Sequence, residues 1–202
     1  MMSVRKALAL SSNTIAVKVA ETLGDSYSEA TDVMMDYLKN FGITTLLDSK
    51  TKEESYTDRY FPSLVLGGMV YGISPLEMAA AYGTLANGGT YIEPTVFTTI
   101  TTFDGNLLVK ANPQENRVVS EDVAYVVTDM LQAVVKEGTG KRAAIENMAV
   151  AGKTGTTNDA LDAWFVGYTP YYVGATYIGD DAGTGEKRQS VMGTSSTAAS
   201  LW

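Results

Sequence analysis

Three apolar segments near the C-terminal end constrain the fold more than any other feature of the sequence. They span Met148–Thr156, Asp162–Tyr168 and Tyr171–Ile178, and only a few residues separate each from the next. Connections this short cannot carry a crossover, so consecutive strands must pair as antiparallel neighbours. Because the segments are apolar on both faces, the sheet needs cover on each side. The sequence therefore predicts an α/β fold of the α+β type, an antiparallel sheet flanked by helices.

The first of these strands ends in a polar motif, Lys153-Thr154-Gly155-Thr156. A lysine that leaves a buried strand must be paired or must open onto a cleft, because an unpaired buried ammonium is very costly. Gly155 lets another backbone come close, and the threonine hydroxyls can hydrogen-bond an anion that the lysine attracts. The motif suits a substrate carboxylate. The alternative is a plain strand end whose lysine reaches into water.

The composition excludes several classes of function. The 202 residues carry 15 basic and 23 acidic side chains, and the resulting net charge of −8 argues against nucleic acid or an anionic membrane as partner. Cysteine and histidine are both absent from the sequence. Their absence removes the usual zinc and iron ligands and every mechanism that needs a histidine base. We therefore expect no metal and no cofactor.

Apolar periodicity predicts helices along most of the remaining sequence. They fall at residues 4–10, 15–23, 30–41, 74–85 and 120–135. Ser74-Pro75-Leu76-Glu77 has the residues of a helix start, with a serine cap, a proline at the first position and a glutamate at the third. Ser11-Ser12-Asn13, taken alone, fits a cap between the first two helices.

The other segments are predicted to be strands and loops. Thr95–Thr102 and Leu107–Val109 flank Asp104-Gly105 and predict a β-hairpin. Asp48–Tyr60 is charged and predicts a surface loop, whereas Gly183–Ser200 is small and polar and predicts a last strand and turn. Gly138-Thr139-Gly140-Lys141 lacks the spacing of a phosphate-binding loop and follows a helix rather than a strand, so we assign it no function.

The Ser11-Ser12-Asn13 motif followed much later by Lys153-Thr154-Gly155-Thr156 resembles the transpeptidase domain of class A, bifunctional penicillin-binding proteins. The resemblance extends over essentially the whole chain and includes Gly72–Ala79, Ala86–Gly89 and Asp162–Pro170. It implies the serine penicillin-recognising fold that β-lactamases and transpeptidases share. It also implies a peptidoglycan D,D-transpeptidase, which cross-links cell-wall stem peptides by serine acyl transfer and is a target of β-lactams.

The resemblance assigns roles to six residues. The catalytic ones are Ser11, Asn13 and Lys153, and the substrate-binding ones are Thr154, Gly155 and Thr156. Ser11 would hydrogen-bond a second catalytic lysine and pass a proton to the leaving amine, and Asn13 would hold the amide of the donor peptide. Lys153 would keep the cleft positive. Thr154 and Thr156 would bind the terminal carboxylate, and the Thr156 backbone N–H would stabilise the oxyanion.

The family's nucleophilic Ser-x-x-Lys is expected before Ser11 and is absent from this chain. Two literal matches, Ser3–Lys6 and Ser49–Lys52, stand in the wrong places relative to Ser-x-Asn, and we interpret both as accidental. We therefore expect residues 1–202 to be a partial transpeptidase domain truncated at both ends, without the nucleophile segment and without the C-terminal helix. Such a fragment should be inactive alone and should expose a large apolar patch.

Two other classes of protein stay open on these residues. One is a related serine D,D-carboxypeptidase or β-lactamase-like hydrolase, and the other is a non-catalytic module that binds a carboxylate or peptide. The partners that the resemblance implies are a stem peptide ending in D-Ala-D-Ala, β-lactam antibiotics and the N-terminal part of the same domain. It also implies a place on the extracytoplasmic face of the bacterial membrane, with an N-terminal transmembrane anchor outside this sequence.

Overall fold

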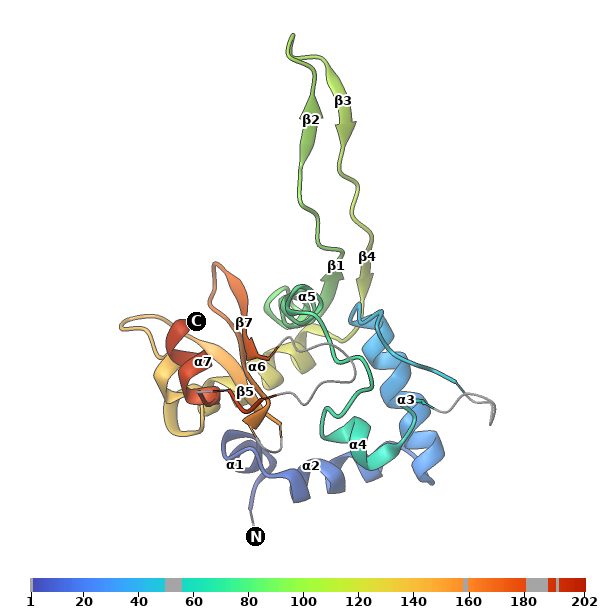
Figure 1. The fold of residues 1–202 in the computed structure, drawn as a ribbon, viewed down its shortest axis with the longest axis vertical. Coiled ribbons are helices and arrows are strands. Elements are labelled where there is room, and N and C mark those ends of the chain that lie inside the picture. Colours follow the sequence, from blue (N-terminus) through green and yellow to red (C-terminus); the bar gives the residue numbers. More distant parts are fainter. Residues whose placement is uncertain (1, 50–55, 158–159, 181–188, 192) are drawn as a thin grey trace.

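The computed structural model describes residues 2–49, 56–157, 160–180, 189–191 and 193–202. Its helices are α1 (Val4–Ala9), α2 (Asn13–Ala20), α3 (Tyr27–Asn40), α4 (Phe61–Val65), α5 (Pro75–Ala86), α6 (Glu121–Glu137) and α7 (Ser195–Leu201), with short 3₁₀ turns at Glu21–Leu23 and Lys141–Ala143. Its strands are β1 (Thr90–Ile92), β2 (Thr99–Thr101), β3 (Leu107–Lys110), β4 (Glu115–Arg117), β5 (Ala151–Thr156), β6 (Asp162–Tyr168) and β7 (Val173–Gly179). Figure 1 shows α1 and α2 along the bottom of the body, α3 and α4 at the right, and the β5–β7 sheet at the left above α1.

The three predicted strands form one antiparallel sheet in the order β5-β6-β7, which confirms the prediction of antiparallel neighbours. The register pairs Lys153 with Val166 and Thr154 with Phe165. The edge strand β5 begins at Ala151 rather than at the predicted Met148. The sheet thus presents the Lys-Thr-Gly motif along its β5 edge.

Helices cover both faces of this sheet. On one face, the Phe165 ring lies 5.2 Å from the Trp202 ring in an edge-to-face contact, and α7 contributes Ala198 and Ala199 to the same cluster. On the other face, the ring of Tyr168 lies 6.5 Å from that of Tyr82 on α5. Helix α6 contributes Val135 to the apolar cluster on the first face and Leu131 and Val134 to the cluster on the second face. It therefore lies along the edge of the sheet that β5 forms.

The prediction of a strand and turn near the C-terminus was wrong over α7. Thr194 begins this helix by accepting a hydrogen bond from the Ser196 N–H. Two residues of the helix, Ala198 and Ala199, are buried. Alanine favours a helix whereas serine and threonine do not, so packing of the two alanines against Phe165 helps to decide the conformation. Helix α7 therefore supplies cover that we expected to come from outside the sequence. Residues 183–188 and 192 of that prediction lie outside the described residues.

Helix α5 begins as predicted, with a complete capping box. The Ser74 side chain accepts from the Glu77 N–H at 3.2 Å, and the Glu77 carboxylate accepts from the Ser74 N–H at 3.0 Å. The same carboxylate accepts from the N–H and the hydroxyl of Thr44, each at 2.8 Å. Glu77 therefore joins the segment after α3 to the start of α5.

The short helix α4 was not predicted, because five residues are too few for apolar periodicity to appear. It packs through Phe61 against Ala20 and Ala30 of the N-terminal helices. Before α4, the buried Asp58 carboxylate accepts from the Leu47 N–H at 2.8 Å and from the Val70 N–H at 2.7 Å, so it joins residues on both sides of the helix. Residues 50–55 of the predicted 48–60 loop lie outside the described residues.

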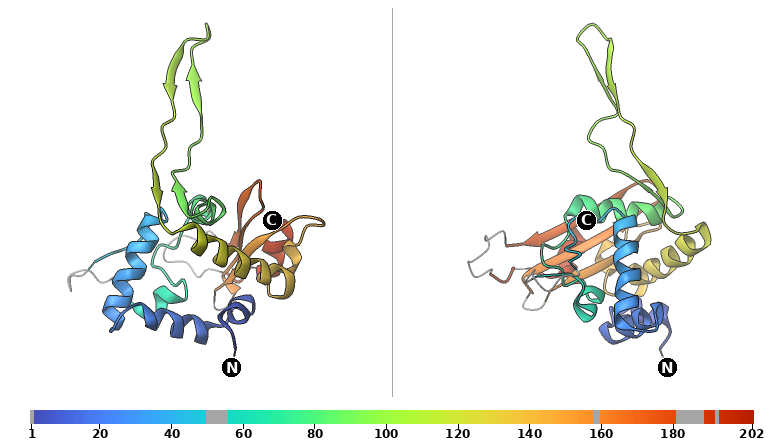
Figure 2. Two further views of the ribbon diagram at one scale, coloured as in Figure 1. Left: turned by 180° about the vertical axis from the view of Figure 1, so that it is seen from behind. Right: turned by 90° about the vertical axis from the view of Figure 1, so that its right-hand side faces the viewer.

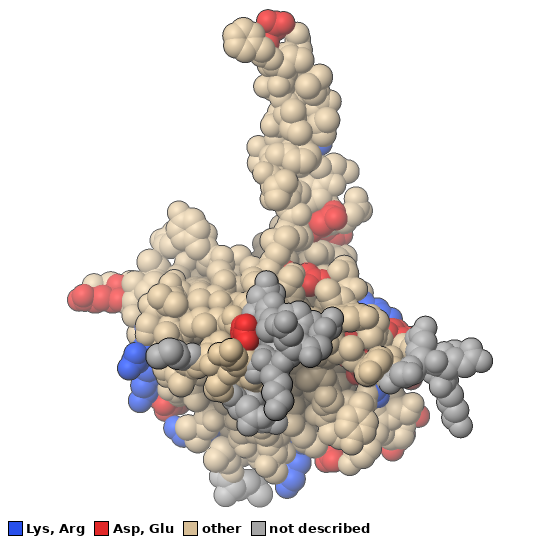
Figure 3. Space-filling view, in the orientation of Figure 1, with Lys and Arg blue, Asp and Glu red and all other residues tan. Residues whose placement is uncertain are grey.

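A long ribbon projects from the body (Figures 1 and 2). Its outer part is the predicted hairpin, β2 paired with β3, and its base is a second antiparallel pair, β1 with β4, which was not predicted. None of residues 93–117 is buried, and the Phe103 ring at the tip is fully exposed. Few charged atoms lie on its visible face apart from the tip and the base (Figure 3). Within the described residues, we find no helix with the length and apolar character needed to cross a membrane.

Candidate active site

Ser11 occupies the tight junction between α1 and α2. The Ser11 N–H donates to the Leu8 carbonyl at 3.1 Å, and the Ser12 N–H donates to the Ala7 carbonyl at 2.9 Å. Ser11 itself has a φ of 56°, in the left-handed region that side-chain-bearing residues rarely adopt. Ser12 is the N-cap residue of α2, as the sequence predicted. Ser11 is exposed. The turn therefore holds a strained serine at the surface.

Lys153 lies in the middle of β5 and reaches across to this turn. Its Nζ donates to Ser11 Oγ at 2.7 Å and to the Thr154 carbonyl at 2.7 Å. We expected Ser11 to hydrogen-bond a lysine outside these residues, and its partner in the structure is Lys153. The two motifs, 142 residues apart in the sequence, thus meet directly.

Burial lowers the pKa of Lys153 from 10.5 to about 8. Desolvation disfavours the charged ammonium, and no described carboxylate lies close enough to form an ion pair with it. Lys153 is therefore mostly charged at pH 7 but loses its proton in mildly basic solution. An amine in this state attracts an incoming anion strongly, because the hydroxyl and carbonyl that it contacts are both neutral.

Thr154 lies on the opposite face of β5 from Lys153, because adjacent side chains alternate along a strand. Thr154 is only 7% exposed, and its hydroxyl shares a hydrogen bond of 2.5 Å with the hydroxyl of Thr139. Thr156 is exposed at the end of the strand. A side chain at Gly155 would lie 3.3 Å from the Trp164 Cβ, so a glycine lets the two strands stay close.

Asn13 is the first residue of α2 and is exposed. Its side chain makes no hydrogen bond to another described residue, so it is available to a ligand. The structure brings Ser11 and Lys153 into contact and leaves Asn13 on the same turn, two residues after Ser11.

Sequence reasoning missed Thr139, which contacts both motif-bearing segments. Its N–H donates to the Ala9 carbonyl at 3.1 Å, and its hydroxyl bonds Thr154. The available signal was a threonine between two glycines directly after a long helix, which we considered only as a failed phosphate loop.

The first of the two Ser-x-x-Lys matches has a structural explanation. The Ser3 hydroxyl caps α1 by accepting from the Lys6 N–H at 3.3 Å, and the Lys6 ammonium lies 3.5 Å from the Glu137 carboxylate. The second match, Ser49–Lys52, lies largely outside the described residues.

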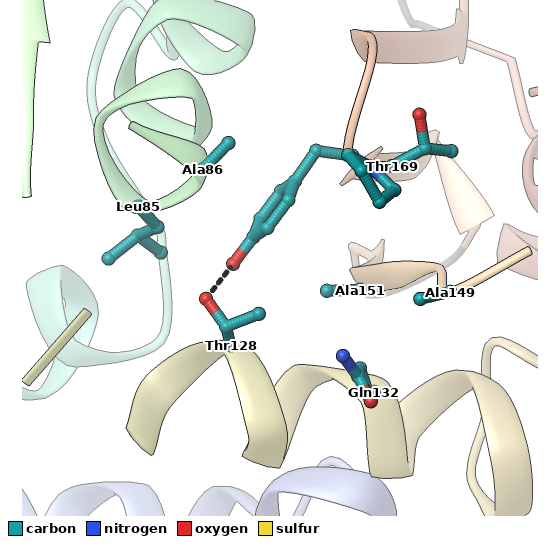
Figure 4. Close-up of a pocket in the computed structure, with 9 residues that line it drawn as sticks. Leu85, Ala86, Thr128, Gln132, Ala149, Ala151 and Thr169 are labelled. Carbon is teal, nitrogen blue, oxygen red and sulfur yellow. Dashed lines mark hydrogen bonds between the residues drawn. The ribbon is translucent and has the colours of Figure 1, made fainter. Parts of the chain in front are cut away.

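Two cavities in the structure lie away from these residues. One of about 150 Å³ lies between α5, α6 and the sheet, where Thr128 and the Tyr168 hydroxyl share a hydrogen bond of 2.7 Å (Figure 4). Another of about 330 Å³ lies between α5, β1 and Val173. In the part of the chain that the structure describes, no cluster of three or more aspartate, glutamate, histidine or cysteine side chains could hold a metal ion.

An antiparallel sheet whose edge strand presents Lys-Thr-Gly to a serine on a helix junction defines the class of serine penicillin-recognising proteins. Within that class, the chain belongs to the transpeptidase family: the family model of the penicillin binding protein transpeptidase domain matches residues 1–196. Helices and an antiparallel sheet are arranged as in solved members of this fold, which confirms the predicted fold class.

Known proteins similar to the chain bear related names. Penicillin-binding protein 1A of Clostridium botulinum is 38% identical over the whole chain, which covers 22% of that protein, and penicillin-binding protein 1A/1B of Bacillus subtilis is 37% identical over 88% of the chain, covering 19%. Penicillin-binding protein 1A from Haemophilus influenzae superposes with a TM-score of 0.72 at 27% identity, over 92% of this chain and 32% of that one. The D,D-transpeptidase domain of a peptidoglycan glycosyltransferase from Eggerthella lenta superposes with a TM-score of 0.70 at 26% identity. This superposition covers 99% of the present chain and 52% of that one. The chain thus spans about a fifth of the length of these curated relatives.

Proposed function

We propose that this chain is part of a peptidoglycan D,D-transpeptidase that cross-links stem peptides by serine acyl transfer. The observation that carries the proposal is the 2.7 Å hydrogen bond from Lys153 Nζ to Ser11 Oγ. It joins the two motifs through which the family handles its substrate, in a chain that the family model matches over residues 1–196. The nucleophilic serine and its lysine belong to the part of the protein outside residues 1–202.

In the proposed reaction, that serine attacks the carbonyl between the two terminal D-alanines of a stem peptide. The C–N bond breaks, the peptide stays on the serine as an ester, and D-alanine leaves with a proton on its amine. Ser11 would relay this proton, and the hydrogen bond that it accepts from Lys153 supports this role, because its own hydroxyl hydrogen can then be donated to the leaving nitrogen. The amine of a neighbouring peptide then attacks the ester, gives up a proton and releases the serine.

Lys153 contributes charge to this reaction rather than the nucleophile. Its ammonium attracts the terminal carboxylate of the donor peptide and orients the Ser11 hydroxyl. Thr156, exposed at the end of β5, offers a hydroxyl to the carboxylate and a backbone N–H to the oxyanion. Asn13 can hold the peptide amide, because its side chain both donates and accepts.

β-Lactams should react at the same site, since they acylate the serine that the stem peptide acylates. Solved structures of this fold at 23% and 21% identity include complexes of penicillin-binding protein 3 from Mycobacterium tuberculosis with aztreonam and with ampicillin. The substrate also fixes where the enzyme works, because stem peptides are cross-linked outside the cytoplasm. We therefore place the whole protein at the extracytoplasmic face of the membrane.

The test uses the full-length protein, a fluorescent penicillin and a cross-linking assay on polymerised stem peptides. Replacing Lys153 by alanine should slow acylation at least about tenfold, because a charge-assisted contact to a carboxylate contributes roughly 1.5–3 kcal/mol. Lys110→Ala on the exposed β3 strand is the matched control and should react at the wild-type rate. Rapid release of the penicilloyl group by water would instead favour a hydrolase. Failure of the wild-type protein to acylate at all would refute the proposal.

A further inference from the structure

The Ser11–Lys153 contact joins segments that are far apart in the sequence, so something must hold them in place. Ser11 follows α1, and Lys153 lies on β5. Helix α1 is held against α6 by ion pairs of Arg5 with Asp129 and Lys6 with Glu137. These pairs are exposed, and exposed ion pairs contribute little. A second connection between the two segments passes through Thr139, which is itself exposed but whose two partners, Ala9 and Thr154, are buried.

The first half of this connection is a main-chain contact to α1. The Thr139 N–H donates to the Ala9 carbonyl at 3.1 Å, and Ala9, two residues before Ser11, is fully buried. The contact requires a glycine beside it, since a Cβ at Gly138 would lie 2.2 Å from the Ala9 oxygen. The loop therefore approaches the end of α1 as closely as two backbones can.

The second half is a side-chain contact to β5. The Thr139 hydroxyl bonds the Thr154 hydroxyl at 2.5 Å, and Thr154 directly follows Lys153. The Thr154 carbonyl also accepts from Lys153 Nζ at 2.7 Å, so one residue of β5 contacts both Thr139 and the ammonium. Thr154 is nearly buried, and a buried hydroxyl that loses its partner must find another or expose itself to water.

The loop that carries Thr139 is itself fixed. The N–H groups of Gly138 and Gly140 both donate to the Val134 carbonyl at the end of α6, each at 3.0 Å. A Cβ at Gly140 would lie 3.1 Å from the Phe165 ring, so the sheet closes over this side of the loop. Thr139 is thus held between two glycines on a rigid support.

We propose that Thr139 is a positioning residue that sets the distance between Ser11 and Lys153 by tying the end of α1 to the Lys-Thr-Gly strand. This proposal rests on the transpeptidase function proposed above. Without the Thr139 hydroxyl, β5 shifts to hydrate Thr154, and this shift moves Lys153 away from Ser11. The effect falls on the rate of acylation, because Lys153 and Ser11 act on the reacting groups together.

The test compares Thr139→Val with Thr139→Ser in the full-length protein. Valine has nearly the same shape but no hydroxyl, whereas serine keeps the hydroxyl, and both keep the N–H to Ala9. We expect valine to lower the second-order rate constant for penicillin acylation by about tenfold, as the loss of a hydrogen bond to the nearly buried Thr154 hydroxyl predicts. Serine should stay within about twofold of wild type. If the valine variant does not melt cooperatively, Thr139→Ala replaces it with the same expected outcomes.

A second readout separates positioning from a general loss of stability. In a Thr154→Val background, Thr139→Val should cause no further loss in rate, because the bond it removes is already gone. The double variant should also melt at a higher temperature than the single Thr139→Val variant, since it leaves no Thr154 hydroxyl unpaired. Equal acylation rates for wild type and the Thr139→Val variant would overturn the positioning role. So would a rate loss from Thr139→Val that is as large in the Thr154→Val background as in the wild-type background. A wild-type protein that does not react would refute the transpeptidase function instead.

Discussion

The lowered pKa of Lys153 predicts how acylation depends on pH. With a pKa of about 8, Lys153 is about 90% charged at pH 7 and about 10% charged at pH 9. If the charged ammonium recruits the carboxylate, the rate constant for penicillin acylation should fall about tenfold across this interval. An exposed lysine would show no change until above pH 10. Because burial disfavours the charged lysine, the same shift lowers the free energy of unfolding by on the order of 3 kcal/mol below pH 8. This destabilisation decreases as the pH rises from 8 to 10.5 and is absent above 10.5.

The measurement is the rate of labelling by a fluorescent penicillin from pH 6.5 to 9.5, in the full-length protein, with the antibiotic's own hydrolysis subtracted. Lys153→Arg is the informative variant, because a guanidinium stays charged throughout this range. Its absolute rate should be lower than wild type, since the fork of donors does not fit the Ser11 contact, but its profile should be flat. A basic limb that survives unchanged in the arginine variant would show that another group titrates, and the reasoning from Lys153 would be wrong.

Three further predictions concern stability and reactivity. Burial would raise the pKa of Glu77, but hydrogen bonds from Thr44 and Ser74 outweigh it and lower the pKa to about 2. Its contribution, about 1 kcal/mol after a discount for solvent screening, should therefore be present above pH 4.5 and lost as pH falls toward 2, and urea melts of Glu77→Gln should lack this loss. Ser11→Gly should be about 1 kcal/mol more stable than Ser11→Ala by the same melts, because glycine accepts the positive φ, and both variants should acylate slowly. The 202-residue chain alone should show no penicillin adduct by intact mass; an adduct at Ser3 would contradict its role as a helix cap.

Local patterns predicted the elements whose residues decide their own conformation. Ser74 and Glu77 satisfy each other's backbone groups within one turn, so the start of α5 could be predicted from four letters. Helix α7 (Ser195–Leu201) also has a capping box, but its third position is Thr197 rather than glutamate or glutamine, so the sequence carries no clear helix start. Its helix also depends on the packing of Ala198 and Ala199 against Phe165. The pairing of β1 with β4 likewise depends on contacts more than 20 residues apart along the chain.

The candidate site shows the same division. The motifs marked Ser11 and Lys153 as members of one site, but not that the ammonium would bond that hydroxyl directly. The lowered pKa of Lys153 follows from burial, which no short motif encodes. The two glycines around Thr139 mark the position, but its role could not be predicted, because that role arises from contacts with Ala9 and Thr154 that form only in the folded chain.

The projecting ribbon has a practical consequence for experiments on this protein. None of residues 93–117 is buried, so the ribbon adds nothing to the cooperative core and should exchange its amide hydrogens faster than β5 or α6. Its turn at Asp104-Gly105 lies at the far end from the body in Figure 1. A fluorophore or affinity tag inserted there should leave the spacing of Ser11 and Lys153 untouched. The ribbon is therefore a suitable attachment site for single-molecule or surface-attached measurements of acylation.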